Sequence, residues 1–132
     1  MRPIIFVGPE ERELRRYFTA ALSQRAAVLC EADARAFAGL VANCDLFVAC
    51  DSGPVHLACA LGIRTVAIFL KNNFNHWGPP AELARIVYRE QGPTLDIVLK
   101  AYREELALAT RADFPAAGGG EIAAKAISVA RG

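Results

Sequence analysis

A chain of 132 residues is long enough to bury a core of its own, and it fits one globular domain over residues 1–132. With 54% hydrophobic and 22% charged residues it is too apolar for a disordered chain, and this balance favours buried parallel strands. A formal net charge of +1 provides no basic surface for nucleic acid and no polybasic segment for a membrane, so we expect neither as a partner.

The cysteines and the N-terminal residues indicate a cytoplasmic protein. Cys30, Cys44, Cys50 and Cys59 have no Cys-x-x-Cys spacing and lie in apolar runs, which disfavours a zinc site or a disulfide framework and favours buried free thiols. The apolar run after Met1 is too short for a signal peptide, and no stretch is long enough to span a membrane. We expect a reducing, cytoplasmic location, no metal and no cofactor.

The chain begins with a predicted strand and helix. Residues 4–7, Ile-Ile-Phe-Val, form a buried strand that ends at Gly8, and Pro9 begins a helix. Apolar residues recur in this helix at helical spacing: Leu14, Tyr17, Phe18, Ala21 and Leu22. Three carboxylates are expected in its first turn, where they complement the helix dipole: Glu10, Glu11 and Glu13.

A second strand and helix follow. Residues 26–30 form a short strand, and Asp33 can cap the next helix by accepting hydrogen bonds from its first N–H groups. The apolar face of this helix is formed by Phe37, Leu40, Val41 and Cys44.

Residues 51–56, Asp-Ser-Gly-Pro-Val-His, lie between two apolar runs at 45–50 and 65–69, so this region predicts a strand, a tight turn, a short helix and a strand. Pro54 suits the first helical position because its φ is fixed near the helical value and it has no N–H to lose. Ser52 or Gly53 can then cap the helix. Gly62 can adopt the left-handed conformation that ends it after about two turns.

The N-terminus of this short helix is expected beyond the carboxyl end of the preceding strand, where ligands bind in open α/β sheets. We expect an anion there, and a phosphate is the best candidate. Asp51 would repel a phosphate, so its expected role is to orient backbone groups or ligand hydroxyls. The alternative is that Asp51, Ser52 and Pro54 only cap the helix and that His56 is an ordinary first-turn residue.

The remaining elements complete the predicted fold. A strand over 64–70, a polar loop over 71–80 and a strand over 85–89 precede a helix that begins near Pro93. A second amphipathic helix is predicted over 121–130, so residues 93–132 form a helical tail whose exposed apolar face would favour a homo-oligomer. The expected fold is a single Rossmann-like α/β domain: a doubly wound, largely parallel sheet of five or six strands, with helices on both faces and C-terminal helices.

Residues 51–62, Asp-Ser-Gly-Pro-Val-His-Leu-Ala-Cys-Ala-Leu-Gly, resemble the signature of the heptosyltransferase family, glycosyltransferase family nine, which is Asp-(Ser/Thr)-Gly-x-x-His-Leu-x-x-Ala-Leu-Gly. Residues 36–45 resemble the helix before this signature, and Trp77-Gly78-Pro79 resembles the loop after it. The resemblance implies the C-terminal, donor-binding, Rossmann-like half of a two-domain enzyme that transfers a sugar from a nucleotide-sugar to lipopolysaccharide core.

The resemblance also implies site residues. Residues 51–56 would hold the donor's diphosphate, and an acidic residue after the first strand, Glu10 or Glu11, would bind the ribose; the alternative is that both carboxylates only complement the helix dipole. Where this chain has Phe69-Leu70-Lys71-Asn72, the family usually has Phe-Gly-Pro-Thr, so a Gly for close approach and a Thr donor are missing. Lys71 either replaces them as a point charge or is a solvated loop residue.

Two functions follow from these patterns. The first is the donor-binding half of a glycosyltransferase that uses an ADP-heptose-like nucleotide-sugar and acts on lipopolysaccharide core or a related glycan. In this family the catalytic base comes from the other half, so we expect no catalytic residue here and an N-terminal acceptor-binding domain or subunit as partner. His56, beside a helix N-terminus, suits a neutral hydrogen-bond donor better than a base. The second function is a non-catalytic nucleotide-binding, regulatory or structural module of the same fold.

Overall fold

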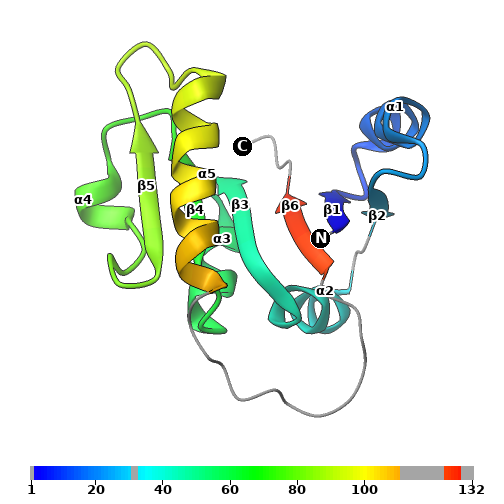
Figure 1. The fold of residues 1–132 in the computed structure, drawn as a ribbon, viewed down its shortest axis with the longest axis horizontal. Coiled ribbons are helices and arrows are strands. Elements are labelled where there is room, and N and C mark those ends of the chain that lie inside the picture. The colour runs from blue at the N-terminus through cyan, green and yellow to red at the C-terminus, as the bar shows by residue number, and fades with distance from the viewer. Residues whose placement is uncertain (1, 31–32, 111–123, 129–132) are drawn as a thin grey trace.

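The structure, a computed structural model, describes residues 2–30, 33–110 and 124–128. Strands and helices alternate along the chain, as the sequence predicts for an α/β fold (Figure 1). The elements are β1 (Arg2–Val7), α1 (Arg12–Leu22), β2 (Ala27–Cys30), α2 (Ala34–Ala42), β3 (Cys44–Cys50), α3 (Gly53–Ala60), β4 (Thr65–Phe69), α4 (Phe74–Trp77), β5 (Ala84–Tyr88), α5 (Leu95–Ala109) and β6 (Ala124–Ser128).

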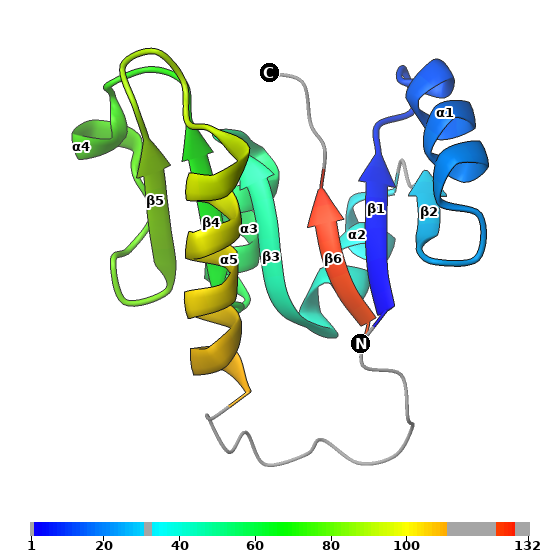
Figure 2. The same cartoon turned by 45° about the horizontal axis from the view of Figure 1, so that its top comes forward.

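The strands form one six-stranded sheet in the order β2-β1-β6-β3-β4-β5, and every neighbouring pair is parallel. From β1 the chain crosses to β2 on one side, and from β3 it crosses to β4 on the other, so the winding reverses at the centre of the sheet. Figure 2 shows α1 and α5 in front of the sheet and α2 and α3 behind it. The predicted doubly wound, parallel sheet with helices on both faces is confirmed.

Each face of the sheet has its own apolar core. The strand period of two residues divides β3 between them: Phe47 and Ala49 pack on the side of α2 and α3, and Leu46 and Val48 pack on the side of α5. The larger cluster contains Ile4, Phe6, Val41, Cys44, Phe47, Ala49, Val55, Ala58, Ala67 and Phe69. The smaller cluster contains Leu46, Val48, Val66, Val87 and Ala101.

An ion pair fastens α5 to the sheet. Arg64 Nη1, just before β4, lies 2.7 Å from Glu105 Oε2 on α5, and the Glu105 side chain is only 8% exposed. A buried carboxylate is costly unless it is paired and hydrogen-bonded. The buried Glu105 carboxylate therefore needs the Arg64 guanidinium as its partner.

The first helix begins later than predicted. Pro9 and Glu10 belong to a turn in which the Glu11 N–H donates to the Gly8 carbonyl at 3.0 Å, and α1 begins only at Arg12. This turn competes with the helix because the Glu11 carboxylate also accepts a hydrogen bond from the Gly8 N–H, at 2.9 Å. The expectation that Glu10 and Glu11 lie in the first helical turn is therefore wrong, and only Glu13 does.

The C-terminal segment also differs from the prediction. α5 begins after Thr94, as expected, but residues 124–128 form strand β6 and not part of a helix over 121–130. Two parallel strands flank β6 and pair with it along both edges, and such pairing outweighs a weak helical pattern. Of the predicted helical tail, residues 111–123 and 129–132 lie outside the described residues. Among the described residues, the predicted association through C-terminal helices could involve α5 only. α5 packs one face against the sheet.

Candidate functional site

The turn after β3 has the predicted course of strand, turn and short helix. The Asp51 N–H donates to the Ile68 carbonyl at 2.9 Å, which ties the end of β3 to β4. The Ser52 backbone is extended, with φ −167° and ψ 170°, and its hydroxyl donates to the Cys50 carbonyl at 2.8 Å. Ser52 is therefore the N-cap residue of α3 by position, but its side chain makes no capping bond. The alternative that Ser52 serves only as a helix cap is therefore not supported by a side-chain hydrogen bond.

α3 packs one face against the sheet, and its first turn is partly exposed to solvent. Val55 and Ala58 are fully buried against the sheet, while Gly53 and His56 are exposed and Asp51 is half-buried. α3 begins at Gly53, one residue before the predicted start at Pro54, which lies in the first helical turn, and Gly62 has φ +75° as predicted. The first N–H groups of a helix have no intrahelical acceptor, so this end presents donors and the positive end of the helix dipole at the carboxyl edge of the sheet.

A methyl group would fit at Gly53 without touching the protein. A Cβ built there meets no heavy atom within 4 Å, so the fold itself does not require glycine at this position. Because Gly53 has no side chain, a ligand can approach the backbone of the α3 N-terminus closely.

The two predicted carboxylates after β1 differ in their contacts. Glu11 accepts the hydrogen bond from the Gly8 N–H, so its carboxylate already has a structural role, whereas Glu10 is exposed on the same turn. Both lie at the carboxyl end of β1, at the same edge of the sheet as Asp51. Of the two, Glu10 is the one that can turn toward a ligand without giving up this backbone contact.

The turns after β1 and β3 flank the point where the winding of the sheet reverses. Only β6 lies between these two strands, so at about 5 Å per strand spacing the two turns are about 10 Å apart. In open α/β sheets the crevice at such a switch point is the usual ligand site. The tertiary structure thus places Glu10 and Glu11 after β1 and residues 51–56 after β3, on either side of β6 at the carboxyl edge of the sheet.

The loop after β4 adds two features. Lys71 is exposed at the same edge of the sheet. Asn73 Oδ1 is buried without a hydrogen-bond donor, the one such side-chain atom among the described residues, and a ligand hydroxyl or a water can supply that donor. The loop then turns tightly at Gly78, whose N–H donates to the Phe74 carbonyl at 2.7 Å and where a Cβ would clash with that carbonyl oxygen.

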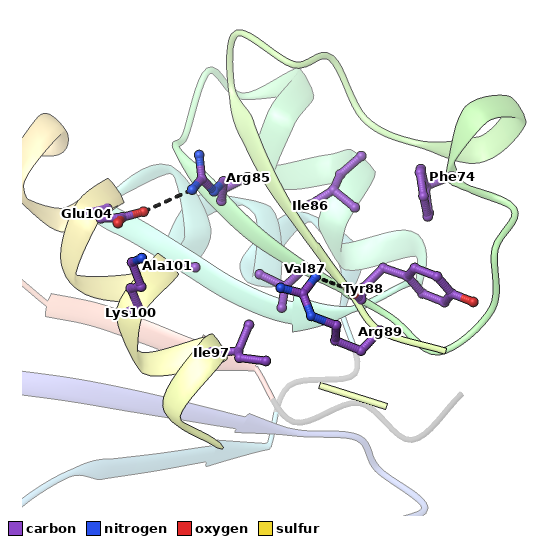
Figure 3. Close-up of a pocket in the computed structure, with 10 residues that line it drawn as sticks. All are labelled: Phe74, Arg85, Ile86, Val87, Tyr88, Arg89, Ile97, Lys100, Ala101 and Glu104. Carbon is purple, nitrogen blue, oxygen red and sulfur yellow. Dashed lines mark hydrogen bonds and ion pairs between the residues drawn. The ribbon is translucent and has the colours of Figure 1, made fainter. Parts of the chain in front are cut away.

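A pocket of about 700 Å³ lies between β5 and α5, away from the predicted site residues (Figure 3). Arg85 reaches Glu104 at 3.0 Å, and the Arg89 guanidinium donates to the Tyr88 carbonyl at 2.9 Å. The pocket is lined by Phe74, Arg85, Ile86, Val87, Tyr88, Arg89, Ile97, Lys100, Ala101 and Glu104. This pocket has no local signal in the sequence, because its residues belong to elements far apart in the chain and alternating charges on an outer strand are usual for solvent-facing edges.

The thiols divide by position. Cys44 and Cys59 are buried as expected, Cys50 is partly buried, and Cys30 is exposed on the edge strand β2, against expectation. Burial, and secondly the charge of Asp51, raises the pKa of Cys50. Burial also raises the pKa of Cys59, which a hydrogen bond with Thr65 partly offsets. Cys44 begins β3 and does not lie on the α2 face as predicted.

Within residues 2–30, 33–110 and 124–128, no three His, Cys, Asp or Glu side chains are grouped closely enough to bind a metal ion. No helix of this described part is long and apolar enough to cross a membrane.

Comparison with known proteins adds three findings. A model of glycosyltransferase family 9 (heptosyltransferase) matches residues 3–103. Lipooligosaccharide heptosyltransferase 2 of Campylobacter jejuni is 43% identical over 49 residues, which are 36% of this chain and 15% of that protein. The crystal structure of the glycosyl transferase family 9 protein from Veillonella parvula superposes with a TM-score of 0.66 and 21% identity, over 81% of this chain and 37% of that one. The chain thus spans well under two thirds of either relative.

Proposed function

We propose, because the chain belongs to glycosyltransferase family 9, that it is the donor-binding half of a glycosyltransferase and binds a nucleotide-sugar in the crevice between the turns after β1 and β3. The observation that carries the proposal is the placement of Glu10 and residues 51–56 on opposite sides of the switch point. Its extension to an ADP-heptose-like donor and a lipopolysaccharide-core acceptor rests on the heptosyltransferase likeness. A cytoplasmic location, where such donors and free thiols are stable, is part of the proposal.

Each side of the crevice has a distinct task. The open N-terminus of α3 supplies N–H donors and a favourable dipole for the diphosphate, and Gly53 lets the phosphate approach the backbone. His56, exposed on the first turn, donates to a phosphate oxygen. Asp51 accepts from donor hydroxyls, and Glu10 accepts from the ribose. Lys71 adds a charge at the rim where the neighbouring loop lacks the family's Gly and Thr.

Gly53→Ala tests the phosphate position directly. The added methyl meets no protein atom, so the melting temperature stays unchanged, but it blocks phosphate from the α3 backbone and weakens ADP or UDP binding by about 10-fold, or ~1.4 kcal/mol. The measurement is a titration followed by amide shifts of residues 51–57. Gly39→Ala on α2, also without a Cβ neighbour within 4 Å, is the matched control and leaves binding unchanged. Equal affinities for wild type and Gly53→Ala would exclude phosphate from this helix end.

The chain by itself is expected to transfer no sugar. Transfer needs an acceptor hydroxyl positioned against the donor and a base within reach, and such positioning contributes several powers of ten in rate. This chain covers only 15% and 37% of the two relatives, and the family resemblance implies that the catalytic base comes from the other half. Incubation with nucleotide-sugars and a lipopolysaccharide-core acceptor, followed by mass spectrometry, checks this. Turnover that His56→Ala abolishes would contradict the half-enzyme proposal.

The non-catalytic alternative is separated by adding a partner. If a polypeptide carrying an acceptor-binding half restores transfer, the chain is an enzyme subunit. If nucleotide binds but no such partner gives turnover, the chain is a binding or regulatory module of the same fold.

A further inference from the structure

The pocket between β5 and α5 is a groove along the outer edge of the sheet. Among the described strands β5 pairs only with β4, and a strand at the edge of a sheet presents unpaired backbone N–H and C=O groups. All of residues 85–89 line the pocket, and they span about 13 Å at the rise of an extended strand. The lining thus follows the strand along its length. We call this pocket, with the lining residues already named, the β5 groove.

The side of the β5 groove that faces α5 has an excess of positive charge. Because strand side chains alternate, Arg85 and Arg89 lie on the same face as Val87, which packs in the smaller apolar core with α5. The lining contains one carboxylate, Glu104, and Arg85 already pairs with it at 3.0 Å (Figure 3). Within the described part of the chain no ion pair joins a carboxylate to Arg89 or Lys100. These two exposed cations are therefore available to a carboxylate from outside.

The other side of the β5 groove is apolar. Ile86 and Tyr88 are half-buried there, and the Tyr88 ring contacts Phe74 of α4 at 5.4 Å between centroids. The Phe74 ring in turn contacts Phe69 at 5.9 Å, which fixes this wall to the core. A strand added beside β5 would place its side chains alternately on these two sides. The groove therefore suits a strand in which acidic and apolar residues alternate.

A second copy of the chain is a poor match for the β5 groove. In an antiparallel pair of β5 strands centred on Val87, Arg85 of one copy lies opposite Arg89 of the other, and like charges directly opposite each other are destabilising. Charged residues on edge strands protect against such self-association. The other edge strand, β2, reads Ala-Val-Leu-Cys and has no charge that would select a partner. The charges on β5 disfavour a copy and favour a partner of opposite charge.

We propose that the β5 groove is a docking site for an extended acidic segment of a partner polypeptide, which adds to the sheet as a further strand beside β5. Main-chain hydrogen bonds to the outer edge of β5 supply affinity, as in other cases of strand addition. Carboxylates at every second residue pair with Arg89 and Lys100, and the residues between them pack on Ile86 and Tyr88. The docking does not depend on nucleotide binding.

The test uses the full chain and short peptides with blocked ends. The probe is Ser-Glu-Val-Glu-Val-Glu-Ser, which reads the same in both directions. One control, Ser-Lys-Val-Lys-Val-Lys-Ser, reverses the charge, and the other, Ser-Glu-Glu-Val-Val-Glu-Ser, keeps the composition but breaks the alternation. Hydrogen exchange is followed at single amides. We expect saturating probe, and neither control, to slow exchange at alternate amides of residues 84–89 by ~10-fold or more, while amides of β2 keep their rates.

Methylation of the peptide backbone separates strand addition from simple charge attraction. A probe methylated at every Val and Glu nitrogen keeps its charges and side chains, but those residues have no N–H to donate. We expect it to bind more weakly than the probe by ~10-fold or more. Equal binding of the two peptides would show charge attraction alone and would overturn the proposal.

Charge reversal in the chain sharpens the test. Arg89→Glu combined with Lys100→Glu should weaken binding of the acidic probe by ~10-fold or more and allow the lysine peptide to bind, because the excess charge of the groove changes sign. Both side chains are exposed, so the fold should be kept, which circular dichroism checks. Arg15→Glu combined with Arg16→Glu, two exposed changes on α1, alters the net charge equally and should leave probe binding unchanged.

Three further results would overturn the proposal. The acidic probe does not bind, or it binds while amides of residues 84–89 keep their exchange rates. The doubly substituted β5–α5 variant binds the acidic probe as tightly as the unchanged chain. Size-exclusion chromatography shows a dimer of the chain alone in which the outer amides of β5 are already protected, so that a second copy occupies the groove.

Discussion

The elements on the two sides of β6 differ in how firmly they are packed. β3 and β4 are buried along most of their length, and α5 covers them with a buried residue, Ala101, and a buried ion pair. On the other side, α1 has no buried residue, and β2 is half-buried with an exposed end. Few buried apolar contacts mean a low free energy of local opening. The sequences differ in the same sense, because four of the first five residues of α1 are charged, Arg-Glu-Leu-Arg-Arg, whereas α5 begins with Leu-Asp-Ile-Val-Leu.

The largest effect is expected from the packed side. Phe47 is fully buried and contacts Phe37, so Phe47→Ala removes a large side chain from the core and lowers the free energy of unfolding by ~3–5 kcal/mol. Leu14→Ala on α1, where the side chain is only partly buried, should cost about 1 kcal/mol. Urea unfolding of both variants measures the ratio. Equal losses would contradict the unequal packing of the two sides.

Two ion pairs of α5 provide a second contrast. Arg64→Met leaves the buried Glu105 carboxylate without its partner and should cost about 3 kcal/mol, at the low end for buried pairs because Arg64 is 32% exposed. Arg85→Met breaks the pair with Glu104, whose side chains are 54% and 42% exposed, and should cost under ~0.5 kcal/mol. Thermal unfolding of both variants at one pH checks the order. A larger loss for Arg85→Met would mean that burial does not set the strength of these pairs.

The smallest effects concern the thiols. Iodoacetamide at neutral pH should label exposed Cys30 on the β2 side before Cys50 and Cys59, as mass spectrometry of the peptides can show. Asp51→Asn removes the second cause of the raised Cys50 pKa and should speed its labelling by ~2-fold or more. Cys59, whose pKa is shifted by burial and by the hydrogen bond with Thr65, is the internal control.

The raised thiol pKa values also set the sign of a pH effect. In the unfolded chain these thiols ionise near 9.0, and in the folded chain at higher pH. Below pH 9 both states are protonated and the thiols' contribution to stability is fully present. As the pH rises through and beyond 9 the unfolded chain loses protons first, so this contribution is lost. Cys50→Ser should reduce the loss of stability between pH 8 and 10, and an unchanged slope would contradict this assignment.

The sequence by itself determined the elements whose signals are local. The apolar runs of β1, β3, β4 and β5, the start of α3 within one residue of Pro54 and its end before Gly62 follow from strand periodicity and from the fixed or permissive φ of proline and glycine. The same local signals predicted residues 51–56 as a turn at the carboxyl edge of the sheet. They also explain why α5 was predicted near its true start.

Only the tertiary structure decided the features that depend on distant partners. Residues 124–128 have small and apolar residues that suit a helix or a strand, and two open strand edges select the strand. The Gly8–Glu11 bond moved the start of α1, and strand order brought Glu10 opposite residues 51–56. The physical reason is that local sequence sets backbone preferences worth a few tenths to about 1 kcal/mol per residue, whereas pairing and burial across the sheet add up over whole elements.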